Sequence, residues 1–177
     1  LKGLLGEAGV GKTAIVEHFD VAYELETTMS ERGKDLGVLD STRATPGSII
    51  TVRQQVPMGL GHAVWCARAI VGDEPFALLL GDTLLSSNDP DRPILRQMID
   101  IYEDRQESVI ALDEVERQKV PLYGIAGGEN RADGIIELNQ LIEKPSVEEA
   151  PSNLAIAGRY VLRPEIFNYL AETGPGK

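Results

Sequence analysis

The chain has 177 residues, which is long enough for one substantial domain with a hydrophobic core. Hydrophobic residues make up 42% and charged residues 25%, the proportions of an ordinary globular protein. The 17 basic and 28 acidic residues give a net charge of −11. That charge argues against a nucleic-acid backbone or an anionic membrane as partner, since both attract clustered Lys and Arg. A small phosphorylated substrate stays compatible with it.

Cysteine content and hydropathy argue against a disulfide-bonded or membrane-spanning protein. The single cysteine, Cys66, excludes an intrachain disulfide and is interpreted as a buried thiol rather than a nucleophile. No apolar run approaches the ~20 residues that a membrane span needs, and the first residues do not form a signal peptide. We therefore expect a cytoplasmic protein whose residues 1–177 form a single domain.

The first half of the chain is predicted to alternate helices and strands. Apolar residues at helical spacing predict an amphipathic helix over residues 13–30, followed by a polar loop to residue 47. A β-like run over 49–54 leads into a helix over 60–71 with one buried face. The continuous apolar run 76–80 is typical of a central strand covered on both faces, and Gly81-Asp82 ends it.

The second half is predicted to be richer in strands. Asp91 is expected to cap a helix that buries Leu95, Met98 and Tyr102, with Pro93 in its first turn. Strands are predicted over residues 108–112, 123–126, 134–141 and 154–162, before a short last helix that Pro164 opens.

This order of elements predicts an α/β fold with a mixed, mostly parallel sheet flanked by helices. In such sheets ligands bind beyond the carboxyl ends of the strands. Gln54 and Asp82 both follow predicted strands. Glycines such as Gly59 and Gly61, between strand and helix, let the backbone approach a ligand without a Cβ in the way. The sequence therefore predicts a ligand site at this edge.

Residues 6–13 fit the P-loop pattern G-x-x-x-x-G-K-S/T at every fixed position. Loop amides would cradle phosphates, Lys12 would reach the terminal ones, and Thr13 would bind the metal with Asp82 as the partner acid. Only five residues precede Gly6, barely enough for the strand that must hold the loop. The segment after Asp82 also lacks further switch elements. A glycine turn leading into a capped helix is the plainer interpretation.

Several segments occur in an order that is specific to one family. They are residues 11–20 (G-K-T-A-I-V-E-H-F-D), 52–54 (V-R-Q), 59–64 (G-L-G-H-A-V), 71–76 (V-G-D-E-P-F), 80–82 (L-G-D), 123–124 (Y-G), 143–145 (E-K-P) and 150–162 (A-P-S-N-L-A-I-A-G-R-Y-V-L). Together they resemble the bacterial UTP–glucose-1-phosphate uridylyltransferases, also called UDP-glucose pyrophosphorylases. The resemblance explains the P-loop match as a chance extension of the family's own G-K-T.

The resemblance implies a Rossmann-like nucleotidyltransferase fold and a reaction that converts UTP and glucose 1-phosphate to UDP-glucose and pyrophosphate with Mg²⁺. The sugar phosphate would attack the α-phosphorus of UTP in line, which needs positioning and charge neutralisation more than covalent catalysis. A homo-oligomer is implied for the full-length protein, because the family tends to assemble.

The resemblance also assigns roles to individual residues. Gln54 would hydrogen-bond the uracil edge, since an amide offers both a donor and an acceptor, and Gly59 would let the backbone approach the base. Asp82 would be a catalytic residue that holds Mg²⁺ against the phosphates. Plainer interpretations are that Asp82 caps a turn and that Gln54 is an ordinary polar residue at a strand end.

On the sugar side the resemblance implies a second group of residues. Gly124 would lie against the sugar nucleotide, and Glu143 would accept hydrogen bonds from the glucose hydroxyls. Lys144 would neutralise phosphate charge in binding and catalysis, and Asn153 and Gly158 would line the sugar. The plainer interpretation of Glu143-Lys144 is a solvated pair before a proline. His18, His62 and Trp65 are interpreted as packing or capping residues.

The chain departs from the family at both ends. Members begin with a strand and a G-x-G-T-R…P-K loop that binds the triphosphate, and a later G-D/E-x-Q-L-T-D segment supplies a second metal ligand. Neither segment occurs in residues 1–177. The sequence therefore predicts a fold that is incomplete at both ends and a partial domain of low or no activity alone. A P-loop NTPase and a non-catalytic, truncated scaffold remain the alternatives.

Overall fold

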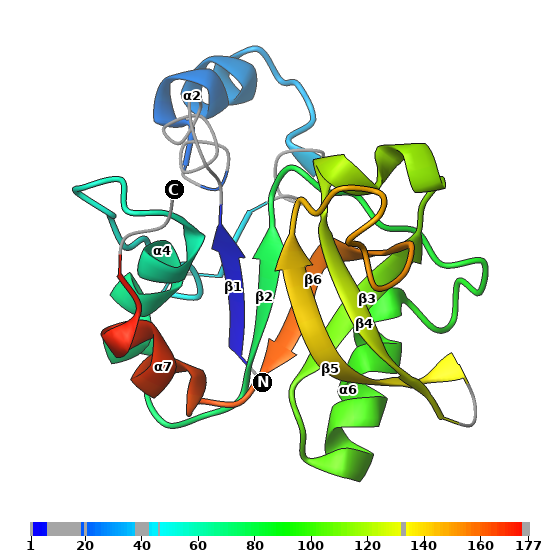
Figure 1. The fold of residues 1–177 in the computed structure, drawn as a ribbon. Helices are drawn as coiled ribbons and strands as arrows, with labels where there is room; N and C mark the ends of the chain where they lie inside the picture. The colour runs from blue at the N-terminus through cyan, green and yellow to red at the C-terminus, as the bar shows by residue number, and fades with distance from the viewer. Residues whose placement is uncertain are drawn as a thin grey trace.

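The computed structural model describes residues 2–6, 19, 21–37, 43–45, 47–131 and 134–174, and Figure 1 shows how their elements are arranged. The strands are β1 (Lys2–Gly6), β2 (Phe76–Leu80), β3 (Val109–Glu114), β4 (Gly124–Asn130), β5 (Ile136–Glu143) and β6 (Leu154–Leu162). The helices are α2 (Tyr23–Glu31), α4 (Leu60–Cys66), α5 (Arg68–Val71), α6 (Ile94–Arg105) and α7 (Ile166–Glu172), with a 3-10 helix η1 (Arg117–Leu122).

The strands form one sheet in the order β1-β2-β6-β4-β5, and β3 pairs with β6 as well. β1 and β2 run parallel, whereas the other pairings of the described strands are antiparallel. The prediction of a mostly parallel sheet is therefore wrong for these strands. β1 reaches β2 through a long connection that contains helices, but only residues 131–135 join β4 to β5, and so short a connection permits only an antiparallel pair.

Helices cover both faces of the sheet, as Figure 1 shows for α4 and α7 on one side and α6 on the other. The first layer buries Val64, Ala67, Val71, Phe76, Leu78, Leu162 and Phe167. The second buries Met98 and Tyr102 of α6 against Val161 of β6, with Leu95 packed beside them. The expected inner face of α6 and the expected central strand β2 are both confirmed. Each buried Val, Leu, Phe or Met side chain stabilises the fold by about 1.5–3 kcal/mol.

The predicted strand over residues 49–54 is wrong. These residues have no regular secondary structure, and the side chains of Ile49, Ile50 and Val52 are 46%, 60% and 45% exposed. β-branched residues favour a strand only where a sheet edge is there to pair with them. Among the described strands no edge pairs with this segment.

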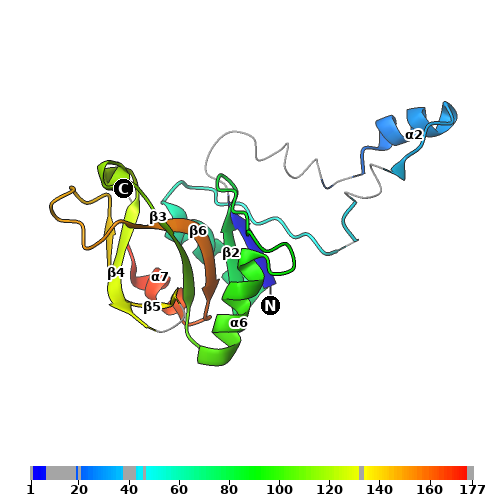
Figure 2. The same cartoon turned by 90° about the vertical axis from the view of Figure 1, so that its right-hand side faces the viewer.

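The two helices predicted in the first half also differ from the structure. Of the helix predicted over 13–30, residues 13–18 and 20 lie outside the described part, and the described portion is α2. α2 buries no residue, and Figure 2 shows it standing away from the sheet. Leu25, expected on its inner face, is 51% exposed. The helix predicted over 60–71 is broken at Ala67 into α4 and α5, which leaves Leu60 and Ile70 exposed while Val64, Ala67 and Val71 are buried.

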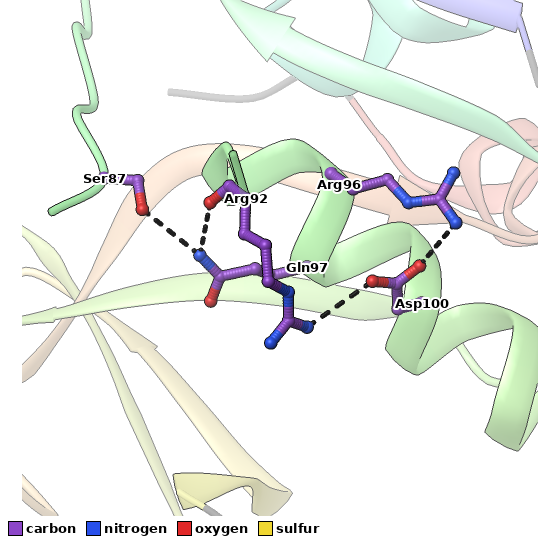
Figure 3. Close-up of polar contacts among 5 residues, drawn as sticks. All are labelled: Ser87, Arg92, Arg96, Gln97 and Asp100. Carbon is purple, nitrogen blue, oxygen red and sulfur yellow. Dashed lines mark hydrogen bonds and ion pairs between the residues drawn. The ribbon is translucent and has the colours of Figure 1, made fainter. Parts of the chain in front are cut away.

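The segment between β2 and α6 is tied to the start of that helix, as Figure 3 shows. The Gln97 amide donates to the carbonyl oxygen of Arg92 at 2.8 Å and to Ser87 Oγ at 3.4 Å. Asp100 pairs with Arg96 at 2.8 Å and with Arg92 at 3.5 Å. The expected cap at Asp91 is wrong, because Pro93 occupies the N-cap position and no side chain caps the helix N–H groups.

The remaining strands and the last helix lie close to their predicted positions. β6 begins and ends where predicted, whereas β3, β4 and β5 are displaced or extended by a few residues. α7 follows Pro164, with Glu165 as its N-cap. No helix in the described part of the chain combines the length and apolar character that crossing a bilayer requires.

Candidate functional site

Strand β6 carries two partners along one edge and leaves a gap between them. Residues 159–162 pair with β2, and residues 154–155 pair with β4. Gly158, in the gap, has a φ of 63°, and the pairing with β3 on the other edge shifts register between Ile110 and Leu112. This irregularity has the features of a β-bulge, which bends a strand. Figure 1 shows β6 curving, and in Figure 2 it runs between β2 and the β4–β5 pair.

The bend brings the carboxyl end of β2 and the amino end of β4 to the same place on the sheet. β2 ends beside Arg159. β4 begins at Gly124, which lies so close to Ile156 of β6 that a Cβ on this glycine would be 3.1 Å from the isoleucine side chain. Because β5 runs antiparallel to β4, its last residue, Glu143, arrives at the same place opposite Gly124. In α/β proteins ligands bind beyond strand ends, and the place where these three strand ends meet is called the crevice below.

Asp82 lies in the turn that follows β2. Its carboxylate is exposed, and within the described residues it accepts one hydrogen bond, from Thr83 Oγ1 at 3.3 Å. An exposed carboxylate with few protein partners is free to coordinate a cation. The plainer interpretation, a turn cap, is weaker because the carboxylate receives no hydrogen bond from the backbone within the described part.

Lys144 has an unusual backbone conformation at the end of β5. Its φ is 47°, although it is not glycine and precedes Pro145, and non-glycine residues rarely adopt such values. A hydrogen bond from its N–H to Tyr123 O at 3.0 Å and the burial of Pro145 hold the turn. Its Nζ lies 3.9 Å from Glu143 Oε1, and both side chains are exposed. Strained backbone of this kind gathers at functional sites.

Glycine at position 124 leaves room for the carboxylate of Glu143. A Cβ at this position would lie 3.1 Å from Glu143 Oε2. Tyr160 of β6 belongs to the same neighbourhood: burial raises the pKa of its phenol, and the negative charge of Glu143 raises it further. The structure therefore brings Gly124, Glu143, Lys144 and Tyr160 together.

Gln54 lies in the irregular segment before α4, and its amide is fixed in place. Nε2 donates to Gly59 O at 3.1 Å and lies 2.9 Å from His62 Nδ1. Gly59 is the N-cap of α4 with φ 88° and ψ 175°, a conformation that is essentially restricted to glycine. Within the described residues, Oε1 of Gln54 accepts no hydrogen bond. A pre-oriented acceptor is thus available, although no contact joins Gln54 to Asp82 or Glu143.

Two further predicted residues have partners within the protein. Asn153 Nδ2 donates to Glu114 Oε1 at 3.1 Å and to Val115 O at 3.2 Å, which ties the start of β6 to the end of β3. A Cβ on Gly158 would lie 3.0 Å from Thr83 Oγ1 and 3.3 Å from Leu80 Cβ. The close approach explains the glycine in structural terms, and the sugar-lining roles of both residues stay predictions.

Arg159 was missed by the sequence-based reasoning. Its Nη1 donates to Leu80 O at 2.7 Å and to Gly158 O at 3.0 Å, and its Nη2 donates to Thr83 O. The guanidinium therefore hydrogen-bonds to the backbone on both sides of Gly81-Asp82. A charged residue inside the otherwise largely apolar run 154–162 was the available signal, because a charge on a half-buried strand requires partners.

Asp82 is the residue that could coordinate a metal ion in this site. Among the residues that the structure describes, no group of three or more His, Cys, Asp or Glu side chains is arranged to hold a metal. Mg²⁺, however, is commonly bound by one or two carboxylates together with substrate phosphates. The exposed oxygens of Asp82 fit the part of a single protein ligand in such an arrangement.

A separate hollow of about 310 Å³ lies between α4 and α7, away from these carboxylates. His62 and Trp65 line it, and their rings stack at 6.1 Å between centroids. The half-buried Cys66 lies 3.9 Å from the His62 ring nitrogens. The interpretation of His62 and Trp65 as packing or capping residues stays a prediction. His18 lies outside the described residues.

Of the P-loop pattern, only Gly6 is described, and residues 7–13 lie outside the described part. Gly6 ends β1, which runs parallel to β2 in register from Lys2↔Phe76 to Gly6↔Leu80. The short stretch before the motif thus holds a strand of five residues, which agrees with the expectation that there is barely room for one. The loop geometry itself is not tested.

Comparisons with known proteins favour one family. A family model for nucleotidyl transferases matches residues 23–176. The UTP–glucose-1-phosphate uridylyltransferase 2 of Staphylococcus saprophyticus is 44% identical over 170 residues, covering 95% of this chain and 57% of that relative. A solved structure of apo-UDP-glucose pyrophosphorylase has a TM-score of 0.83 and 38% identity, covering 99% of this chain and 64% of the other. A UDP-glucose pyrophosphorylase in complex with UDP-glucose has a TM-score of 0.78 and 36% identity, with 99% and 63% covered. The chain thus spans less than two thirds of each relative.

Proposed function

Because the chain belongs to the nucleotidyl transferase family, we propose that it carries the base-reading and sugar-reading parts of an enzyme that makes UDP-glucose and pyrophosphate from UTP and glucose 1-phosphate. The observation that carries the proposal is the crevice at the bend of β6. There the turn of Asp82 and the pair Glu143-Lys144 converge from different strands. The names of the relatives supply the substrates of this proposal.

Gln54 is proposed to read the uracil edge. Its Nε2 is engaged by Gly59 O and His62, so its unpaired Oε1 is the group that would accept the N3–H of uracil. Cytosine and adenine present an acceptor at the corresponding ring position, which would leave Oε1 facing a lone pair. Gly59 would let the backbone approach the base without a side chain between them.

The sugar phosphate is proposed to lie near Gly124, Glu143 and Lys144. The Glu143 carboxylate is an acceptor for sugar hydroxyls, and the Lys144 ammonium neutralises phosphate charge. The glycine opposite Glu143 keeps space free beside that carboxylate. The strained backbone of Lys144 fixes the direction in which its side chain leaves the strand.

The proposed transfer is an in-line displacement. An oxygen of the sugar's phosphate forms a bond to the α-phosphorus of UTP, and the bond from that phosphorus to the bridging oxygen of pyrophosphate breaks. Members of this family generally depend on a metal ion, and we propose Mg²⁺ held in part by Asp82. When bound, the ion would neutralise phosphate charge. Lys144 would stabilise the charge that develops, and the crevice would align the two reactants.

The homo-oligomeric state, the cytoplasmic location and the single domain over residues 1–177 stay predictions. So does the expectation that these 177 residues alone turn substrate over slowly or not at all. Purified chain assayed for pyrophosphate release tests that expectation, and turnover at a rate usual for an enzyme would contradict it.

Nucleotide selectivity tests the proposed function. With Mg²⁺ present, calorimetry should show that the chain prefers UTP and UDP-glucose to ATP. Gln54→Ala should weaken UTP binding by about tenfold, the loss expected for one hydrogen bond to a pre-oriented group, and should leave ATP unaffected. Gln55→Ala, which changes the exposed neighbour, is the matched control and should bind like the wild type.

Two outcomes would contradict the proposal. Preferential binding and hydrolysis of ATP, lost in Lys12→Ala, would identify the P-loop as functional. An absence of binding to every nucleotide, in a chain that unfolds cooperatively, would favour a scaffold without catalytic function.

A further inference from the structure

Arg159 of β6 lies where the regular pairing between β2 and β6 ends. β2 stops at Leu80, β6 bulges at Gly158, and the chain turns through Gly81-Asp82 to Thr83. The carbonyl oxygens of Leu80, Gly158 and Thr83 all accept hydrogen bonds from the Arg159 guanidinium. Unpaired half-buried carbonyls are costly, and this one side chain satisfies them together.

The guanidinium suits this task because of its shape. It is planar, permanently charged, and presents its donors in a rigid fork that can reach acceptors in different directions. A lysine ammonium is a compact point charge on a flexible stem and cannot span carbonyls on both sides of the turn. Within the described residues Arg159 makes no ion pair, so its charge is matched only by carbonyl dipoles beside the Asp82 turn.

The turn is also held at its downstream end. Gln97 of α6 binds Ser87 Oγ and Arg92 O, so the segment that leaves the turn is anchored on the helix (Figure 3). Gly158 packs against Leu80 and Thr83 from the other side. Asp82 itself contributes only the hydrogen bond from Thr83 Oγ1. Its position therefore depends on the backbone around it, which Arg159 fixes.

We propose that Arg159 is a positioning residue of the transfer reaction: it fixes the Gly81-Asp82 turn so that the Asp82 carboxylate meets the metal ion of the bound triphosphate. The inference rests on the proposed function. It separates Arg159 from the residues that touch substrate, and it predicts that the shape of the side chain matters more than its charge.

The test compares UTP binding with and without Mg²⁺ in the 177-residue chain. Wild type should gain affinity when Mg²⁺ is added. Arg159→Lys should bind metal-free UTP within about twofold of the wild type but lose about ten- to hundredfold of the Mg²⁺-dependent gain, as expected for breaking charged hydrogen bonds. Arg163→Lys is the matched control, because Arg163 follows the same strand but pairs with Glu165 at 2.7 Å, and it should match the wild type.

A second readout needs no substitution. In wild-type protein, a guanidinium held by carbonyls on several sides should show separate, slowly exchanging Nη proton resonances for Arg159 by NMR. A third readout uses the variant: hydrogen exchange at the Asp82 and Thr83 amides should accelerate in Arg159→Lys while exchange in α6 stays unchanged.

Three results would overturn the inference. Full retention of the Mg²⁺-dependent gain in Arg159→Lys would show that the fork is not needed. Equal losses with and without Mg²⁺ would show a general structural role, and averaged Nη resonances in the wild type would show that the guanidinium is not held. A wild-type chain that binds no UTP in either condition would overturn the proposed function itself, and the positioning role with it.

Discussion

Lys144 combines a strained backbone with a charged side chain, and the two effects can be separated. Its φ of 47° before a proline costs about 1–2 kcal/mol for a residue other than glycine. Lys144→Gly should therefore leave stability unchanged or raise it by up to about 1 kcal/mol, while UDP-glucose binding falls by about tenfold through the lost charge. Thermal unfolding and calorimetry on the same samples measure both.

Gln106, with a φ of 56° at the end of α6, is the matched control for this substitution. Gln106→Gly should not alter nucleotide binding, because the residue lies outside the crevice. A Lys144→Gly variant that loses stability but keeps its affinity for UDP-glucose would mean that the side chain holds the turn and does not act on the ligand.

Tyr160 reports on the charge of Glu143. The pKa of its phenol is raised above the ordinary value of 10.0 by burial and then by Glu143. The unfolded chain releases this proton near pH 10 and the folded chain at higher pH. The corresponding stability is therefore fully present below pH 10 and is lost as pH rises through the folded pKa. Tyr160→Phe should remove this part of the alkaline loss.

Glu143→Gln should lower the pKa of Tyr160 towards 10.0 without restoring it fully, because burial remains. The difference in phenolate absorbance between each protein and its Tyr160→Phe counterpart follows this single group. An unchanged Tyr160 titration in Glu143→Gln would show that the two side chains are not neighbours in solution.

At the scale of elements, the bulge in β6 is the feature that creates the crevice. Gly158→Ala places a methyl group 3.0 Å from Thr83 Oγ1 at a φ of 63°, so both crowding and backbone strain oppose it. We expect a loss of about 2–4 kcal/mol in the free energy of unfolding, together with a loss of the Mg²⁺-dependent gain in UTP affinity. Urea unfolding and calorimetry provide the two measurements.

Gly134 supplies the control for this substitution. Its φ of 74° imposes a similar backbone cost, but no atom lies within 4 Å of the Cβ position. Gly134→Ala should cost about 1–2 kcal/mol and spare binding. Equal effects of the two substitutions would argue that the packing of Gly158 against the Asp82 turn is unimportant.

Elements with strong local patterns were predictable. The continuous apolar run 76–80 and the inner face of α6 are confirmed, since both depend on burial that the residue pattern itself encodes. The prediction of a strand over residues 49–54 is wrong because its β-branched residues have no sheet edge to pair with among the described strands. The short connection between β4 and β5 made their antiparallel pairing predictable, but the direction of β6 against β2 was out of reach, because it depends on how β6 bends and on the partners that share its edge.

At the scale of the whole molecule, the resemblance assigned site roles that local patterns alone did not. It assigned them to Asp82, Gly124, Glu143 and Lys144; the structure brings the ends of β2, β4 and β5 to neighbouring positions along β6, and the roles stay proposals. It did not reveal Arg159, whose contacts are with main-chain carbonyls that only a folded chain places around it. The family match and the solved relatives establish the nucleotidyl transferase fold for the chain.

The proposed function requires that an acidic chain with a net charge of −11 binds a polyphosphate. Long-range repulsion opposes this binding, so the local charge of Lys144 and a metal ion must supply the attraction. We therefore expect the sugar phosphate in the crevice and the base beside Gln54, whose partner His62 lines the hollow between α4 and α7.

An NMR titration of the chain with UDP-glucose in the presence of Mg²⁺ tests this central claim most directly. The account predicts that the amide resonances that shift belong to residues 54–61, 81–84, 123–125, 143–144 and 158–159. Shifts confined to residues 7–13, or to the hollow lined by Trp65 and Leu170, would contradict it.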